Sequence, residues 1–267
     1  MGDNRPIGIF DSGVGGLTVV RALMEMAPQE NFIYFGDTAH VPYGNKTKHQ
    51  LMQYAREIIS YLLKQDVKAI IIACGTHSSI TLPLLAGNYS IPILGVVKAA
   101  AACAIKTTRN GKIGIAATQA TVNSLAYTRE IKKLNPDCQV YEVACPQFVP
   151  LVESGKLEDE EALLAVAEYL NPLLDLEIDS LVLGCTHYPF LSNLISRFMG
   201  PNVEIIDPSY NTVEEVLEIL NRQELFNTQE NSPFRKFIVS GSKDSFYKVG
   251  RLLIGDTIQE VEKVNLE

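Results

Sequence analysis

Two cysteines occupy the same local setting in two separate parts of the chain. The first stands in Ala-Ile-Ile-Ile-Ala-Cys74-Gly-Thr-His and the second in Ser-Leu-Val-Leu-Gly-Cys185-Thr-His. A short apolar run that ends in a small residue and a polar turn predicts a buried strand leading into a helix. Two thiols presented in the same way predict a chemistry that needs matched groups on opposite sides of one substrate.

Groups able to transfer protons accompany both thiols. A cysteine at a helix N-terminus lies near backbone N–H groups and the positive end of the helix dipole, which favour its thiolate. Asp11 also follows a predicted strand, and His187 lies two residues after Cys185. Ligands of open α/β sheets bind at the carboxyl ends of strands, so we expect Asp11 or His187 to pass a proton to or from a thiol. The other three cysteines are expected to behave as small apolar side chains.

Apolar runs typical of strands alternate with helical patterns along the chain. This alternation predicts an α/β fold with mostly parallel sheets that helices flank on both faces. A capping-box pattern at 47–50 begins one helix, whose apolar stripe continues to Leu62. The other expected helices are 15–27, 98–107, 120–134, 160–174, 212–220 and 242–253, and the expected strands are 6–10, 32–35, 68–73, 92–96, 112–117, 139–143, 180–183, 203–206 and 236–239.

A weak internal repeat predicts two pseudo-symmetric lobes with the active site between them. Ile-Gly-Ile begins a unit at Ile7 and again at Ile113, and the cysteine motifs recur at a similar offset. We expect the first lobe, on the Cys74 side, to comprise residues 1–97 and 208–267. The second lobe, on the Cys185 side, is expected to comprise residues 98–207.

The composition excludes several classes of function. The net charge of −8 argues against nucleic acid as a partner, because phosphate binding needs a basic surface. No apolar run approaches the roughly 20 residues of a membrane span, so we expect no membrane partner. Five scattered cysteines do not resemble a secreted disulfide framework. These features together predict a cytoplasmic enzyme.

The sequence favours neither a nucleotide cofactor nor a metal. The glycines that follow the first strand do not fit the dinucleotide pattern, because Thr18 stands where the third glycine is needed. They predict a tight turn that can bind a carboxylate. Cys185 and His187 alone do not have a zinc spacing. No strand end offers a lysine for a Schiff base, so we expect a reaction without cofactor or metal.

Seven motifs together resemble the glutamate racemase family of the aspartate/glutamate racemase superfamily, and they occur in that family's order from the first strand to about residue 210. They are Gly8-Ile-Phe-Asp11-Ser12-Gly-Val-Gly-Gly-Leu17, Gly36-Asp37-Thr, Pro42-Tyr43-Gly44, the Cys74 motif, Ala117-Thr118 with Thr121, Pro150-Leu-Val-Glu153 and Gly184-Cys185-Thr-His187-Tyr-Pro189. The resemblance implies an isomerase that interconverts L- and D-glutamate without a cofactor and supplies D-glutamate for peptidoglycan. It also implies a homodimer.

The resemblance assigns a role to each matching residue. Cys74 and Cys185 are implied as the catalytic thiols, assisted by Asp11 and His187. The positions implied to contact substrate or support the thiols are Asp11, Ser12, Tyr43, Gly44, Gly75, Thr76, Thr121, Thr186 and His187. Inverting a stereocentre requires a base on one face of the α-carbon and an acid on the other. Two thiols on facing lobes satisfy this requirement in both directions, and hydroxyls at strand ends are suited to stabilise charge on the substrate carboxylate.

One motif departs from the family pattern. The family usually has Cys-Asn-Thr-Ala-Ser at the first thiol, whereas this chain has Gly75 and His77 in place of asparagine and alanine. Gly75 offers only its backbone N–H, which leaves open a preference for aspartate or another amino acid. A thiol-dependent hydrolase, which uses one cysteine with a histidine base, is a second alternative. A degenerate homologue that only binds its ligand is a third.

Overall fold

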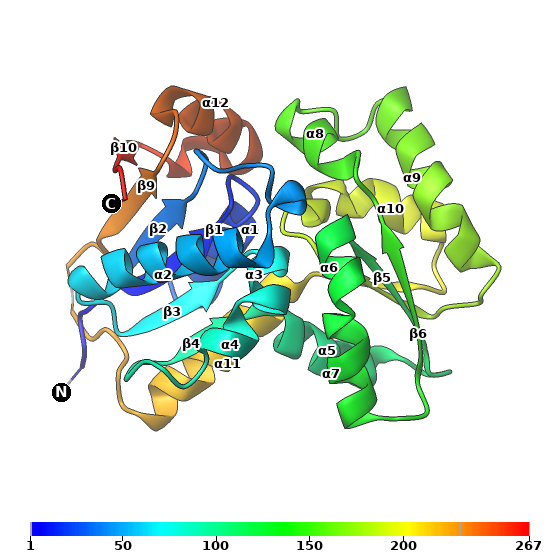
Figure 1. The fold of residues 1–267 in the computed structure, drawn as a ribbon, viewed down its shortest axis with the longest axis horizontal. Coiled ribbons are helices and arrows are strands. Elements are labelled where there is room, and N and C mark those ends of the chain that lie inside the picture. The colour runs from blue at the N-terminus through cyan, green and yellow to red at the C-terminus, as the bar shows by residue number, and fades with distance from the viewer. Residues whose placement is uncertain (1, 230, 267) are drawn as a thin grey trace.

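The structure, a computed structural model, describes residues 2–229 and 231–266 and contains two parallel β-sheets (Figure 1). Their strands are β1 (Ile7–Asp11), β2 (Phe32–Gly36), β3 (Ala69–Ile72), β4 (Ile93–Gly95), β5 (Lys112–Ala117), β6 (Gln139–Ala144), β7 (Ser180–Leu183), β8 (Glu204–Ile206), β9 (Arg235–Val239) and β10 (Glu262–Lys263). The first sheet has the order β10-β9-β2-β1-β3-β4 and the second β6-β5-β7-β8. Each neighbouring pair is parallel.

The two sheets repeat one arrangement. β1 lies between β2 and β3, and β5 lies between β6 and β7. Since β3 ends at Ile72 and β7 at Leu183, Cys74 and Cys185 each stand two residues past the equivalent strand. The prediction of an α/β fold with two similar lobes is confirmed.

Helices cover both faces of each sheet, and each face has its own apolar core. The helices are α1 (Leu17–Met26), α2 (Lys48–Lys64), α3 (Gly75–Ile80), α4 (Leu82–Leu85), α5 (Val96–Thr107), α6 (Gln119–Ser124), α7 (Ala126–Leu134), α8 (Phe148–Glu153), α9 (Glu160–Leu174), α10 (Ser192–Met199), α11 (Pro208–Arg222) and α12 (Lys243–Ile254). In the first lobe α1, α11 and α12 cover one face, and α2 and α4 cover the other. In the second lobe α8, α9 and α10 pack opposite α5 and α7.

Local side-chain chemistry explains where several helices begin. The expected capping box is present at α2, where the Gln50 N–H donates to Thr47 Oγ1 at 3.2 Å and the Thr47 N–H donates to Gln50 Oε1 at 3.0 Å. At α9 the Asp159 side chain accepts the Ala162 N–H, and at α11 the Asp207 side chain accepts the Ser209 N–H, each without the reciprocal bond. These bonds satisfy N–H groups that a helix leaves free at its first turn.

Some expected elements differ from the structure. The helix expected over 120–134 is divided into α6 and α7, because Leu125 adopts a left-handed conformation with φ of 52°. The helix expected directly after Cys74 is present as α3, whereas the short helices α4, α8 and α10 and the strand β10 were not expected. Helices of one or two turns present too few residues for a clear 3.6-residue pattern, so periodicity does not reveal them.

The lobes draw on different stretches of the chain, and both ends of the chain lie in the first lobe (Figure 1). β9 and β10, close to the C-terminus, join the first sheet beside β2. The α11 helix of the first lobe and the α5 helix of the second lobe pack against each other. The expected bounds of 1–97 with 208–267 and of 98–207 stay a prediction. None of the helices in the described residues is long and apolar enough to cross a membrane.

Candidate active site

The loop after β1 holds a fully buried carboxylate. Asp11 Oδ2 accepts hydrogen bonds from the N–H groups of Gly13 and Gly16, each at 3.1 Å. A Cβ on Gly16 would lie 2.6 Å from Asp11 Cβ and 2.8 Å from the Tyr34 hydroxyl, so only glycine fits there. This close approach explains the glycine-rich turn, which binds an acidic side chain of the chain itself.

Cys74 lies beside this carboxylate, at the N-terminus of α3, and only 5% of its surface is exposed. Burial and the negative charge of Asp11 raise the pKa of the Cys74 thiol to about 12. Hydrogen bonds from the His77 N–H and the Ser12 hydroxyl act in the opposite direction, toward a lower pKa. Cys74 is therefore a protonated thiol at neutral pH and becomes a strong base once its proton is removed.

The second thiol lies next to a histidine and a glutamate. Cys185 Sγ is 3.9 Å from His187 Nδ1, and His187 Nε2 is 3.1 Å from Glu153 Oε1. Burial would lower the pKa of His187, but its hydrogen bonds to Cys185 and Glu153 outweigh that effect and raise the pKa to about 10. His187 is therefore a buried imidazolium at neutral pH, with its positive charge between a carboxylate and the Cys185 sulfur.

The residues around Cys74 in the first lobe contact the residues around Cys185 in the second lobe. The Thr186 hydroxyl donates to Asp11 Oδ1 at 3.3 Å. A Cβ on Gly15 would lie 2.4 Å from both Thr186 Oγ1 and His187 Nδ1, so this glycine admits the Cys185 loop. Through these contacts the loop after β1 touches both thiol loops.

A chain of hydroxyl groups forms a second contact between the lobes. Thr76 Oγ1 on α3 lies 3.3 Å from Thr118 Oγ1, which donates to Thr121 Oγ1 at 3.0 Å. Thr118 also caps α6 and accepts the Thr121 N–H. The helices α3 and α6 face each other at this point (Figure 1).

A polar cluster around Asp37 holds the loop that carries Tyr43 and Gly44. The Tyr43 hydroxyl donates to Asp37 Oδ2 at 2.5 Å, and the Ser240 hydroxyl donates to Asp37 Oδ1 at 2.7 Å. His40 Nδ1 lies 2.8 Å from Asp37 Oδ1. Tyr43 packs against Cys74 in a small apolar cluster, whereas Gly44 is exposed.

His77, which departs from the family motif, is fully buried. Its Nδ1 lies 3.1 Å from Thr81 Oγ1, and its ring packs edge-on against Phe10 and Tyr43. Burial lowers the pKa of His77 to about 3, so the ring is neutral. His77 acts on Cys74 through its backbone N–H.

The structure brings most of the predicted site residues together at the ends of β1, β3 and β7. Among these predicted site residues, Gly44 is exposed to solvent. Sequence reasoning gave no role to Glu153, Thr118 or Asp37, although each lies in a motif that resembles the family. Glu153 and Thr118 act through contacts with His187 and Thr76, which are far away in the chain. Asp37 contacts Tyr43 only six residues away, but through a loop without a regular pattern. The roles of the predicted residues stay predictions.

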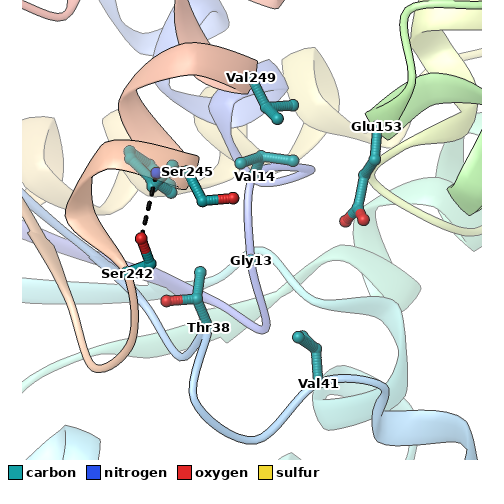
Figure 2. Close-up of a pocket in the computed structure, with 9 residues that line it drawn as sticks. Gly13, Val14, Thr38, Val41, Glu153, Ser242, Ser245 and Val249 are labelled. Atoms are coloured by element: carbon teal, nitrogen blue, oxygen red, sulfur yellow. Dashed lines mark hydrogen bonds between the residues drawn. The ribbon is translucent and has the colours of Figure 1, made fainter.

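A pocket of about 140 Å³ lies in front of the site (Figure 2). Figure 2 shows the Glu153 carboxylate on one side and the hydroxyls of Thr38, Ser242 and Ser245 on the other. Neither thiol lines this pocket, but it reaches the site through Gly13 and through Glu153, the partner of His187. Within the described part of the chain, no three His, Cys, Asp or Glu side chains gather as a possible metal site.

Comparisons with known proteins agree with this geometry. Residues 16–216 match the family model described as Asp/Glu/Hydantoin racemase. A glutamate racemase of Neisseria meningitidis serogroup A is 49% identical, over 100% of this chain and 98% of the relative. The chain belongs to the glutamate racemase family.

Solved structures of members share the fold. The glutamate racemase of Francisella tularensis, solved in complex with D-glutamate, aligns with a TM-score of 0.92 and 38% identity over 99% of both chains. The glutamate racemase of Thermus thermophilus, in complex with beta-chloro-D-alanine, aligns with a TM-score of 0.90 and 41% identity over 100% of this chain and 99% of that one. Family membership identifies this chain as an isomerase of the racemase class.

Proposed function

We propose that this chain racemises glutamate without a cofactor, using Cys74 and Cys185 as two opposed acid/base groups. The observation that carries the proposal is the pair of thiols at equivalent strand ends, one in each lobe. The Cys185 loop is bonded through Thr186 to Asp11, the carboxylate beside Cys74. The similarity to glutamate racemases, one of them solved with D-glutamate, supports glutamate as the substrate.

Each turnover moves one proton to the enzyme and another from it. One cysteine, as thiolate, takes the α-proton, so a C–H bond breaks and an S–H bond forms. The electron pair is delocalised into the substrate carboxylate. The other cysteine, as thiol, gives its proton to the opposite face of the α-carbon, which inverts the stereocentre.

Asp11 and His187 have different tasks in this scheme. Asp11 lies beside Cys74, whose pKa of about 12 makes its thiolate a strong base, and the carboxylate is suited to accept the thiol proton. On the other lobe, the His187 imidazolium places a positive charge beside Cys185 Sγ, and Glu153 holds that charge in place. The two thiols can therefore exchange roles when the reaction reverses.

Substrate binding uses hydroxyl and N–H donors from both lobes. The hydroxyls of Ser12, Thr76, Thr121 and Thr186 and the N–H groups of Gly44 and Gly75 can donate to the two carboxylates of glutamate. Preorganised donors of this kind stabilise negative charge that develops in the reaction. Tyr43 lies over Cys74 and supplies an apolar wall.

The cellular role follows from the same proposal. Racemisation would supply D-glutamate for peptidoglycan in the cytoplasm, and we propose that the enzyme works as a homodimer. We propose the domain bounds of 1–97 with 208–267 and of 98–207 for the two lobes that close on the substrate.

Incubation with L-glutamate in D₂O tests the proposed function. We expect D-glutamate to form with deuterium at the α-carbon, with no added cofactor or metal. L-Aspartate in a parallel reaction tests substrate preference. An enzyme that yields neither α-deuterium nor the D-isomer from glutamate would contradict the proposal. Ammonia released from the side-chain amide of L-glutamine, in a further parallel reaction, would point to the hydrolase.

A further inference from the structure

The two thiol loops meet at a pair of glycines. A Cβ on Gly75, directly after Cys74, would lie only 2.3 Å from the carbonyl oxygen of Gly184, directly before Cys185. Real Cβ atoms essentially never come within 3.0 Å of another heavy atom. The loops can therefore lie this close only because residue 75 has no side chain.

Gly184 has no room to move away from Gly75. Its N–H donates to Ala116 O at 2.7 Å, which fixes its peptide to β5. Its own Cβ position lies 3.0 Å from the ring of the fully buried Tyr127 and 3.1 Å from Ala117 Cβ. The carbonyl group of Gly184 is therefore held in a fixed position on the second lobe.

Gly75 is fixed as firmly to the first lobe. It is the first residue of α3, whose Ser78 N–H donates to Cys74 O at 2.9 Å. The Ser78 hydroxyl donates to Ile72 O at 2.9 Å, which ties the helix to β3. The steric clash caused by a side chain at residue 75 would therefore be relieved by a larger separation of the two lobes rather than by a local shift of either loop.

We propose that Gly75 is a positioning residue, whose missing side chain sets how closely the two thiols approach the α-carbon in the closed enzyme. This inference rests on the proposed two-thiol reaction. Proton transfer needs reacting atoms about 3–3.5 Å apart, and a misplacement of 1 Å can lower a rate about 10²-fold. Asparagine, which the family motif has at this position, would introduce the same collision as alanine and would add a longer side chain.

The inference makes a prediction that runs against the family pattern: restoring asparagine at residue 75 impairs this enzyme. Gly75→Ala and Gly75→Asn are each expected to lower kcat for glutamate about 10- to 100-fold. We expect KM to change less than kcat, because donors on one lobe still bind the substrate. The kinetic isotope effect with α-deuterated glutamate should increase, because a longer transfer distance makes the chemical step rate-limiting.

Ser79→Ala is the matched control. Ser79 is a buried residue of the same helix, and within the described residues its hydroxyl has no hydrogen-bond partner. We expect this variant to keep kcat within about twofold. Since alanine favours a helix more than glycine does, Gly75→Ala should fold, and its thermal melt should match that of the wild type.

A double-mutant cycle tests directly whether the fixed position of the Gly184 carbonyl causes the loss of kcat. In a Tyr127→Leu background Gly184 gains room to retreat, so the kcat loss from Gly75→Ala should shrink at least threefold. In a Tyr127→Phe background the ring remains, and the full loss should persist. An equal loss in both backgrounds would overturn the inference.

The outcomes separate this inference from the proposed function. A wild-type enzyme that exchanges no α-proton refutes the two-thiol reaction itself. An active wild type whose Gly75→Ala and Gly75→Asn variants keep wild-type kcat and isotope effect refutes only the role of Gly75.

Discussion

The Thr186 hydroxyl donates to Asp11 Oδ1 at 3.3 Å, so the residue after one thiol is bonded to the carboxylate beside the other. The negative charges of Asp11 and Cys185 each raise the pKa of Cys74. The ionisation of one thiol therefore opposes that of the other. This coupling suits a reaction that needs one thiol and one thiolate at the same time.

Replacing either thiol should stop racemisation. We expect Cys74→Ala and Cys185→Ala each to lower kcat about 10³-fold, because each variant loses an acid or a base that every turnover requires. A chiral assay of D-glutamate measures the loss. Cys103→Ala is the matched control, since this half-buried thiol lies on α5 and contacts Thr107. A hydrolase using one cysteine would instead retain its activity in one of the two variants.

Asp11→Asn should make the Cys74 thiol more reactive while it lowers the rate of racemisation. The variant keeps the shape of the side chain but removes the charge that raises the pKa of Cys74, so the Cys74 thiolate should form at lower pH. The pH profile of iodoacetamide alkylation, measured in a Cys185→Ala background, reports this shift. Racemisation by the single variant should nevertheless fall about 10²-fold, because the group that accepts the thiol proton is gone. Alkylation that moves to higher pH would exclude this role for Asp11.

Glu153→Gln should change how stability depends on alkaline pH. The folded pKa of His187, about 10, exceeds the ordinary value of 6.5, so its protonated ring stabilises the fold fully below pH 6.5. That stabilisation is lost as the pH rises from 6.5 through about 10. His187 has two hydrogen bonds that raise its pKa, one to Cys185 and one to Glu153. Glutamine removes the carboxylate from the second bond, so the loss of stability should be smaller and should end at lower pH. Urea unfolding from pH 7 to 10 measures it, with Glu158→Gln, an exposed carboxylate, as control. If the free energy of unfolding depends on pH in the same way in both variants, the proposed effect of Glu153 on the pKa of His187 is contradicted.

The sequence predicted what local patterns and strand order determine. The strands that carry Asp11, Cys74 and Cys185 are continuous apolar runs, as parallel strands buried on both faces must be. It did not predict the break at Leu125, where a left-handed residue divides an otherwise helical pattern. It also did not reveal that Glu153 reaches His187, or that Gly75 meets Gly184. Both contacts join residues far apart in the chain. The first depends on packing within the second lobe, and the second depends on the packing of one lobe on the other.

His77→Phe should make the protein more resistant to acid. Burial lowers the pKa of His77 to about 3, whereas in the unfolded chain a histidine titrates near 6.5. Between these values the unfolded state binds a proton that the folded state does not, so the free energy of unfolding falls by about 1.4 kcal/mol for each pH unit of acidification. Phenylalanine cannot bind that proton, and its ring can occupy the same space against Phe10 and Tyr43. Thr81 keeps a partner, because its hydroxyl also donates to the carbonyl of residue 77 at 3.0 Å. Urea unfolding from pH 4 to 7 should therefore show a shallower slope for His77→Phe. The exposed variant His49→Gln should keep the wild-type slope, and an equal slope in all three proteins would show that His77 does not titrate in this way.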